Sequence, residues 1–291
     1  MKKLTNNCKE ILIVLLSVFV LSCKKESSPY VSSSAESNPH NYSESLSDVK
    51  TKYVKNCTLE VYTTLWCGWC PRAKTLTDQA LTAYPNNVVP MEFHGGGGSG
   101  LEDDNALSFD GVRTLMTAFS VPGYPTSYLN RKLKYTGKIS EIAPLITVSS
   151  TSNVSSPVGI AINSSLNGSK LSITARARFA QAMSGSKLVV YVLEDGIVTA
   201  HANYYNDGKG NPILNYVNDH VVRNSASSVL GDLIPAQTLG SEYSKTYTVS
   251  IPTSWNKERL SIAAIVVQSN NSVLNARKAV VGQSQDFQLI Q

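Results

Sequence analysis

The chain has 291 residues, of which 42 % are hydrophobic, and this is enough apolar material for more than one buried core. It carries 26 Lys and Arg against 21 Asp and Glu, a formal net charge of +5 at pH 7, and the basic residues form no long block. This nearly balanced, dispersed charge excludes the basic patch that nucleic-acid binding requires, so we expect no nucleic-acid partner.

The first residues are organised as an export signal. Lysines precede an apolar run over residues 11–21, which suits the core of a signal peptide and is short for a membrane span. The run ends in Val-Leu-Ser-Cys23, which resembles a bacterial lipoprotein box. The resemblance implies a signal peptide over residues 1–22 and a lipid anchor on Cys23. The alternative is an uncleaved anchor with an incidental cysteine.

The segment after the lipoprotein box differs in composition from the rest of the chain. Residues 24–48 are rich in Ser, with Asn, Pro and Glu and few large apolar side chains. Such a segment buries too little surface to offset the entropy of an ordered chain. We therefore expect residues 23–50 to form a lipidated, disordered tether to a folded part that begins near residue 51.

One motif carries the clearest chemistry, namely Trp66-Cys67-Gly68-Trp69-Cys70-Pro71. It lies between a β-type run at residues 59–63 and a helix-compatible segment at 73–84. Cysteines at this spacing can close a disulfide, and a helix start stabilises a thiolate at Cys67. Pro71 suits the first turn of that helix. Taken alone, the motif is compatible with a redox site, half of a zinc site or a structural disulfide.

A second motif narrows this choice. Gly123-Tyr124-Pro125-Thr126 resembles the cis-proline loop of thioredoxins and disulfide isomerases, and Trp66-Cys67-Gly68 resembles their Trp-Cys-Gly. The resemblance implies a thioredoxin-like α/β domain over residues 51–148. The segments expected to form its strands are residues 59–63, 88–93, 127–129 and 132–137. Those expected to form its helices are residues 73–84, 110–119 and 139–146. The catalytic residues implied by the resemblance are Cys67, Cys70, Pro125 and Trp66, and the implied substrate-binding residues are Tyr124, Thr126 and Trp69.

The chain also departs from thioredoxins. The acid that assists the second cysteine there would fall at Val61, and the neighbouring Glu60 should point to the other face of its strand. Trp69 stands where thioredoxins have proline and disulfide isomerases have histidine. Because that position influences the reduction potential, the direction of electron transfer is left open. Cys57 is expected to be a buried, unreactive thiol.

The pattern changes after the first predicted domain. Residues 149–157 are rich in Ser and Thr and are interpreted as a linker. Beyond them apolar residues alternate with polar ones in about seven short runs, which predicts an Ig-like antiparallel β-sandwich over residues 158–291. An insert at residues 200–232 interrupts the pattern and is expected to be a surface loop followed by a strand. His201 and His220 are interpreted as polar loop residues.

The whole series of features is distinctive. The lipoprotein box, the tether, the two thioredoxin-like motifs, Asn130-Arg131 and His220-Val-Val-Arg223 resemble a family of Bacteroidota outer-membrane lipoproteins named for a twenty-eight-kilodalton antigen. The resemblance covers nearly the whole mature chain. It implies a thioredoxin-like domain followed by a β-sandwich and attachment to the outer membrane, and it implies architecture more than mechanism.

Three functions agree with these features, and whether the protein is an enzyme is left open. The first is thiol–disulfide exchange on exported cysteine-containing proteins, with a redox partner and no cofactor besides the Cys67–Cys70 pair. The second is a non-enzymatic adhesion or scaffold lipoprotein in which the same pair is a structural disulfide. The third is a copper carrier that uses Cys67, Cys70 and His94.

Overall fold

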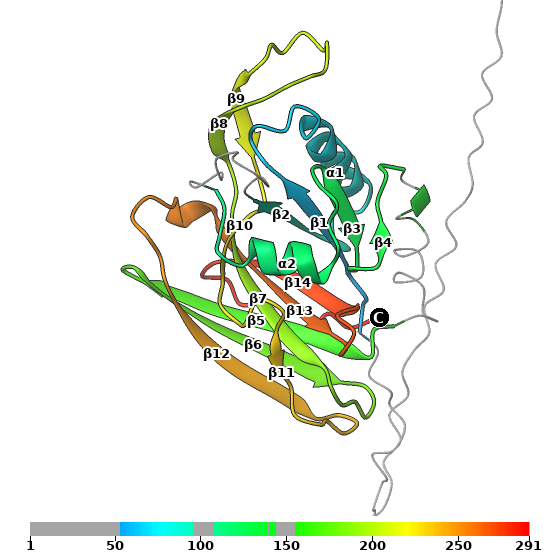
Figure 1. Cartoon of the computed structure of the whole chain (residues 1–291). Helices are drawn as coiled ribbons and strands as arrows, with labels where there is room; N and C mark the ends of the chain where they lie inside the picture. Colours follow the sequence, from blue (N-terminus) through cyan, green and yellow to red (C-terminus); the bar gives the residue numbers. More distant parts are fainter. Residues whose placement is uncertain (1–52, 96–106, 139, 142, 144–154, 291) are drawn as a thin grey trace, which may run out of the picture. The chain divides into compact units, whose positions relative to one another are not determined.

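The computed structural model describes residues 53–95, 107–138, 140–141, 143 and 155–290 (Figure 1), all within one compact unit, Asp48–Gln291. The predicted signal peptide, Cys23 and the tether as far as residue 50 lie outside the described residues. Most of the predicted linker and most of the helix expected at 139–146 lie outside them as well. These expectations stay predictions.

The N-terminal part of the unit is a small α/β arrangement. In chain order its elements are β1 (Cys57–Thr63), α1 (Pro71–Ala83), β2 (Val88–His94), α2 (Val112–Ala118), β3 (Thr126–Leu129) and β4 (Leu133–Lys134). β1 pairs in parallel with β2 and antiparallel with β3, and β4 pairs antiparallel with β3. The strands and helices predicted as far as residue 137 are thus confirmed, with ends shifted by a few residues.

Alternation along β1 places a different helix on each face. Leu59 and Val61 share a buried cluster with Ala73 and Ala80 of α1. Tyr62, on the other face, shares a cluster with Val112 and Leu115 of α2. The period-two rule for strand side chains therefore explains why α1 and α2 lie on opposite sides of the sheet.

The C-terminal part is almost entirely β-structure. Its elements are β5 (Val158–Asn167), β6 (Lys170–Phe179), β7 (Lys187–Glu194), β8 (Ile197–His201), β9 (Ile213–Asn218), β10 (Val221–Ser225), β11 (Asp232–Leu233), β12 (Glu242–Ser250), the short 3-10 helix η1 (Lys257–Arg259), β13 (Leu260–Val267) and β14 (Val273–Val280). β12, β6 and β5 form one antiparallel sheet. It packs against β7, β13 and β14 around a core of alternating Val, Ile, Leu and Ala side chains. The predicted β-sandwich is confirmed.

The larger sheet runs through both parts of the unit. Among the described residues its strand order is β14-β13-β7-β10-β2-β1-β3-β4, with β11 beside β7. The junction is a parallel contact between β10 and β2, where the Glu92 N–H donates to the His220 carbonyl at 2.8 Å. The composition of the chain changes at the predicted boundary, residues 149–157, but the parts on either side of that boundary share one sheet.

Both faces of β7 and β13 are buried. Val190 and Ile262 face the sandwich core, whereas Tyr191 and Ile265 face a second core together with Phe93 of β2. Figure 1 shows α2 lying across this second face. Strands that are covered on both faces have nearly continuous apolar sequences. The sequences of β7 and β13 are of this kind.

Because of this shared core, we expect cleavage within residues 149–157 to leave the two fragments associated. Separating them would expose the second core to water, at about 25 cal/mol per Å² of apolar surface. Limited proteolysis followed by gel filtration should show one peak that contains both fragments. Two separate peaks, each with native circular dichroism, would contradict the shared core.

Candidate functional site

The Cys-x-x-Cys motif forms the turn between β1 and α1. The Cys67 N–H donates to the Thr64 carbonyl at 3.2 Å, and the Cys70 N–H donates to the Cys67 carbonyl at 2.9 Å. Cys67 and Cys70 are joined in a disulfide with an S–S distance of 2.10 Å. Cys70 is the residue before α1, and Pro71 is the first residue of the helix, as its missing N–H allows.

The structure brings the second motif to the first. The Tyr124–Pro125 peptide bond is cis and immediately precedes β3. The rings of Tyr124 and Trp66 meet edge to face with centroids 5.9 Å apart. Thr126 Oγ1 donates to the Gly123 carbonyl at 2.7 Å, which closes the loop on itself. Tyr124 and Trp66, predicted from separate motifs, are therefore direct neighbours.

A hollow of about 280 Å³ lies beside the motifs. Trp69, Pro125 and Thr126 line it, together with Leu76 of α1 and Tyr205 of the insert. Three of the predicted site residues therefore share one surface. Tyr205 was not among the predicted residues, although the long insert marks that region of the sequence as unusual.

Part of the insert forms the β8–β9 hairpin (Figure 1), and the 202–212 loop of this hairpin contacts the disulfide turn. The Ala202 N–H donates to the Leu65 carbonyl at 2.8 Å, and the Tyr204 N–H donates to the Gly68 carbonyl at 2.8 Å. Tyr205 Oη donates to the Trp69 carbonyl at 3.3 Å. The expectation of a surface loop followed by a strand is confirmed, since β9 follows the loop, and the structure adds that the loop contacts the first part of the unit.

Aromatic rings complete this cover. The Trp69 ring meets the rings of Tyr204 and Tyr205 edge to face, with centroids 5.6 Å and 5.1 Å away. A Cβ added to Gly68 would lie 2.3 Å from the Tyr204 ring, so only glycine permits this approach. Beneath the cover Cys67 is 7 % exposed and Cys70 is 1 % exposed.

The 202–212 loop is held by its own hydrogen bonds. The buried Asn203 donates through Nδ2 to Asp207 Oδ1 and to the Gly210 carbonyl, both at 3.0 Å, and its backbone N–H donates to Asn211 Oδ1. Hydrogen bonding by Asn203 keeps the pKa of Asp207 below its usual value. The loop is thus held both by hydrogen bonds within itself and by its contacts with the disulfide turn.

We expect Tyr204→Ala to speed reduction of the disulfide by dithiothreitol about two- to tenfold, since an aromatic pair contributes about 0.5–1.5 kcal/mol beyond area burial. The reduced fraction is measured by alkylation and mass spectrometry over time. Leu214→Ala is the matched control, because Leu214 lies in the same hairpin and is 70 % exposed. A rate in Tyr204→Ala equal to that of the wild type would show that the ring does not shield the disulfide.

Glu60 has a structural partner on the other face of β1. Its Oε1 lies 2.8 Å from Arg131 Nε, and both side chains are fully buried. Arg131 also donates to Tyr191 Oη at 3.2 Å and stacks on Phe119. Burial alone would lower the pKa of Arg131, but the nearby Glu60 carboxylate raises it above its ordinary value. The predicted orientation of Glu60, away from the face of Val61, is confirmed.

Other predicted side chains lie elsewhere. His94 is buried, and its Nε2 lies 3.7 Å from Glu92 Oε2. Within the described part of the chain there is no cluster of three or more His, Cys, Asp or Glu side chains that could hold a metal ion. His201 is buried at the end of β8 rather than lying on a polar loop. Cys57 is buried, and burial raises the pKa of its thiol to about 12, so it is unreactive as predicted.

Fold and site together define a β-rich protein, with three sheets among the described residues, that carries a covered disulfide at the start of a helix. A family model described as outer membrane protein Omp28 matches residues 112–285. The chain belongs to this family, and the resemblance inferred from its motifs is confirmed. The family is one of outer-membrane proteins, so the predicted location at the outer membrane is confirmed, and the lipid anchor on Cys23 stays a prediction. The helices that the structure describes are too short or too polar to cross a membrane.

Solved structures resemble the chain to different degrees. HBP35 of Porphyromonas gingivalis has a TM-score of 0.65 and 20 % identity, covering 81 % of this chain and 78 % of that one, which indicates a common fold. A protein of Agrobacterium tumefaciens has a TM-score of 0.47 and 15 % identity, covering 79 % and 96 %. A domain of the outer membrane lipoprotein Omp28 from Porphyromonas gingivalis has a TM-score of 0.30 and 17 % identity, covering 44 % and 89 %. No curated protein matches the chain.

Proposed function

We propose that this lipoprotein exchanges disulfides with exported proteins through Cys67 and Cys70, on a thioredoxin-like arrangement of residues 51–148. The observation that carries the proposal is the contact between the Cys-x-x-Cys motif and the cis-proline loop. A Cys-x-x-Cys disulfide stands at the start of α1, and the loop with the cis Tyr124–Pro125 bond meets it through the Trp66–Tyr124 ring contact. A purely structural disulfide needs no such loop beside it.

The exchange proceeds in two balanced steps. The Cys67 thiolate attacks one sulfur of a substrate disulfide, which forms a mixed disulfide and releases the other substrate sulfur as a thiolate. The Cys70 thiolate then attacks Cys67 Sγ and releases the second substrate thiolate. The substrate gains two electrons, and the Cys67–Cys70 pair loses two. The reverse sequence oxidises a substrate dithiol, and the reduction potential decides which direction operates.

The residues around the pair have supporting roles in this proposal. Pro125 and Thr126 present an extended substrate segment to Cys67, while Trp69 and Tyr124 supply aromatic surface on either side. A lipid on Cys23 and a tether over residues 23–50 hold the exchange site away from the membrane surface. The substrates are exported cysteine-containing proteins, and a redox partner restores the pair.

The cover over the site favours a second candidate, a non-enzymatic lipoprotein in which the disulfide is structural. The 202–212 loop is anchored to the disulfide turn by backbone hydrogen bonds at Leu65 and Gly68, and the sulfur-bearing residues are nearly inaccessible. In this candidate the disulfide fixes the turn so that the hairpin of the β-rich part can dock on it.

The reduction potential separates the two candidates. The full chain is equilibrated in glutathione buffers, and the oxidation state of the peptide with Cys67 and Cys70 is read by alkylation and mass spectrometry. An exchange site comes to equilibrium with a potential above about −300 mV, whereas a structural disulfide stays oxidised throughout the series. The second result would replace the exchange proposal by the structural one.

A further inference from the structure

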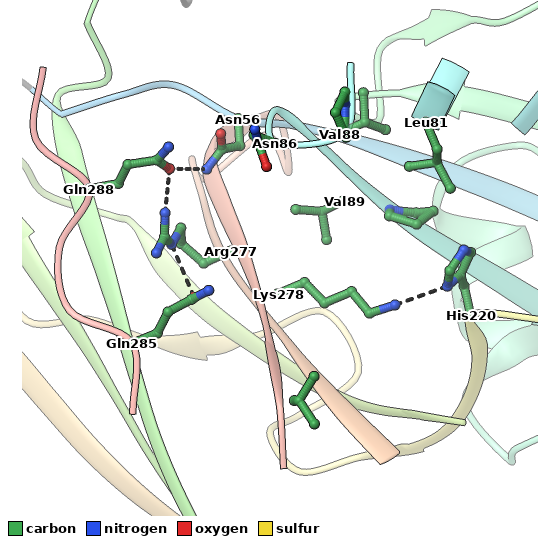
Figure 2. A pocket seen from close by; sticks show the side chains of 13 residues that line it. Asn56, Leu81, Asn86, Val88, Val89, His220, Arg277, Lys278, Gln285 and Gln288 are labelled. Carbon is green, nitrogen blue, oxygen red and sulfur yellow. Dashed lines mark hydrogen bonds between the residues drawn. The ribbon is translucent and has the colours of Figure 1, made fainter. Parts of the chain in front are cut away.

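A second hollow lies at the junction of the two parts and has no residue in common with the hollow beside the disulfide. Figure 2 shows it between the start of β2, strand β14 and the C-terminal segment. Its volume is about 550 Å³, within the range of about 300–1,000 Å³ that small-molecule sites occupy. The charges on β14 indicate what such a molecule would be.

Arg277 of β14 is half-buried in this hollow without a carboxylate partner among the described residues. It donates through Nε to Gln285 Oε1 at 3.2 Å, through Nη1 to Gln288 Oε1 and through Nη2 to the Asp286 carbonyl at 3.4 Å. All these acceptors are neutral, and burial lowers the pKa of Arg277. The guanidinium has five N–H groups, so two remain for a ligand.

Lys278, the next residue, already has a counter-charge. Its Nζ lies 3.4 Å from Asp195 Oδ2 and 2.9 Å from His220 Nδ1 (Figure 2). Burial would raise the pKa of Asp195, but the hydrogen bonds from His220 and the charge of Lys278 hold it well below its usual value. Asp195 therefore stays ionised and balances Lys278. Of the two basic side chains, Arg277 and Lys278, that line the hollow in the described part of the chain, Arg277 is the one without a counter-charge.

The rest of the wall is apolar or neutral. Leu81, Val88 and Val89 line the side toward β2 (Figure 2), as does Pro90, and none of the lining residues that the structure describes is acidic. We propose that this hollow binds a small monocarboxylic acid, whose carboxylate pairs with Arg277 and whose aliphatic body lies against Val88 and Val89. A carboxylate accepts two parallel N–H hydrogen bonds from a guanidinium. Its single negative charge would neutralise the positive charge of Arg277, which has no carboxylate partner among the described residues.

Titration calorimetry on the full chain with hexanoate and with its neutral analogue hexanamide tests the proposal. Hexanoate should bind at least about tenfold more tightly, since a hydrogen-bonded charge pair contributes more than a neutral contact. Arg277→Gln should remove this preference, and Arg277→Lys should keep a weaker one. Arg178→Gln, which changes an arginine on β6 paired with Glu242, should leave binding unchanged.

Methyl NMR on the unmodified chain keeps the test independent of how the variants fold. Hexanoate should shift the methyl signals of Val88, Val89 and Val280, which line the hollow. Equal binding of hexanoate and hexanamide, absence of binding, or shifts confined to other methyl groups would overturn the proposal. Inorganic phosphate that binds as tightly as hexanoate would also overturn it, because the aliphatic wall would then contribute nothing.

Discussion

Cys67→Ser should abolish disulfide exchange, whereas Cys70→Ser should accumulate mixed disulfides with exported proteins. Cys67 is the more exposed of the two, at 7 % against 1 %, and precedes Pro71, the first residue of α1, by four residues. In the proposed exchange Cys67 is therefore the attacking group, because the positive end of a helix dipole stabilises a nearby thiolate. Without Cys70 the mixed disulfide has no internal thiol to resolve it, so the adduct persists.

Adducts are detected on non-reducing gels after acid trapping of cells, with identification of the partner by mass spectrometry. Cys57→Ser is the matched control, because Cys57 is buried and should neither form nor resolve adducts. If Cys70→Ser traps no partner and both variants lose stability to the same extent, the disulfide is structural. The glutathione titration and this experiment should then agree.

Arg131→Met should lower the free energy of unfolding by about 3–5 kcal/mol, because it leaves the Glu60 carboxylate buried without its cation. Replacing both partners, as Glu60→Leu with Arg131→Met, should recover most of this loss, since no charge is then left unpaired. Urea denaturation followed by circular dichroism measures each step. The loss would report on the junction of the two parts, because Arg131 also contacts Tyr191 of β7.

A partly exposed ion pair is the matched control for this result. Arg178 pairs with Glu242 across β6 and β12, and its side chain is 44 % exposed. Arg178→Met should therefore cost at most about 1 kcal/mol. A loss in Arg131→Met no larger than in Arg178→Met would mean that the buried Glu60–Arg131 pair contributes no more to stability than a partly exposed pair.

Local signals made the N-terminal elements and the candidate site predictable. Pro71 after Cys70 marks the start of α1, because proline is tolerated where the helix needs no N–H donor. Pro125 within Gly-Tyr-Pro-Thr marked the loop before β3 by resemblance. Alternating apolar residues also predicted the sandwich strands, since side chains on a strand point alternately to its two faces.

The sequence by itself determined the N-terminal elements, the sandwich character of the second part, the cysteine pair, the family and the face on which Glu60 lies, because these depend on neighbouring residues or short motifs. Only the tertiary structure decided that β2 pairs with β10, that Arg131 neutralises Glu60 and that Tyr204 covers Gly68. Each of these joins residues far apart in the chain. Backbone pairing, charge pairing and ring packing across such distances leave no periodic pattern in the sequence, since they arise only when the folded chain brings the partners together.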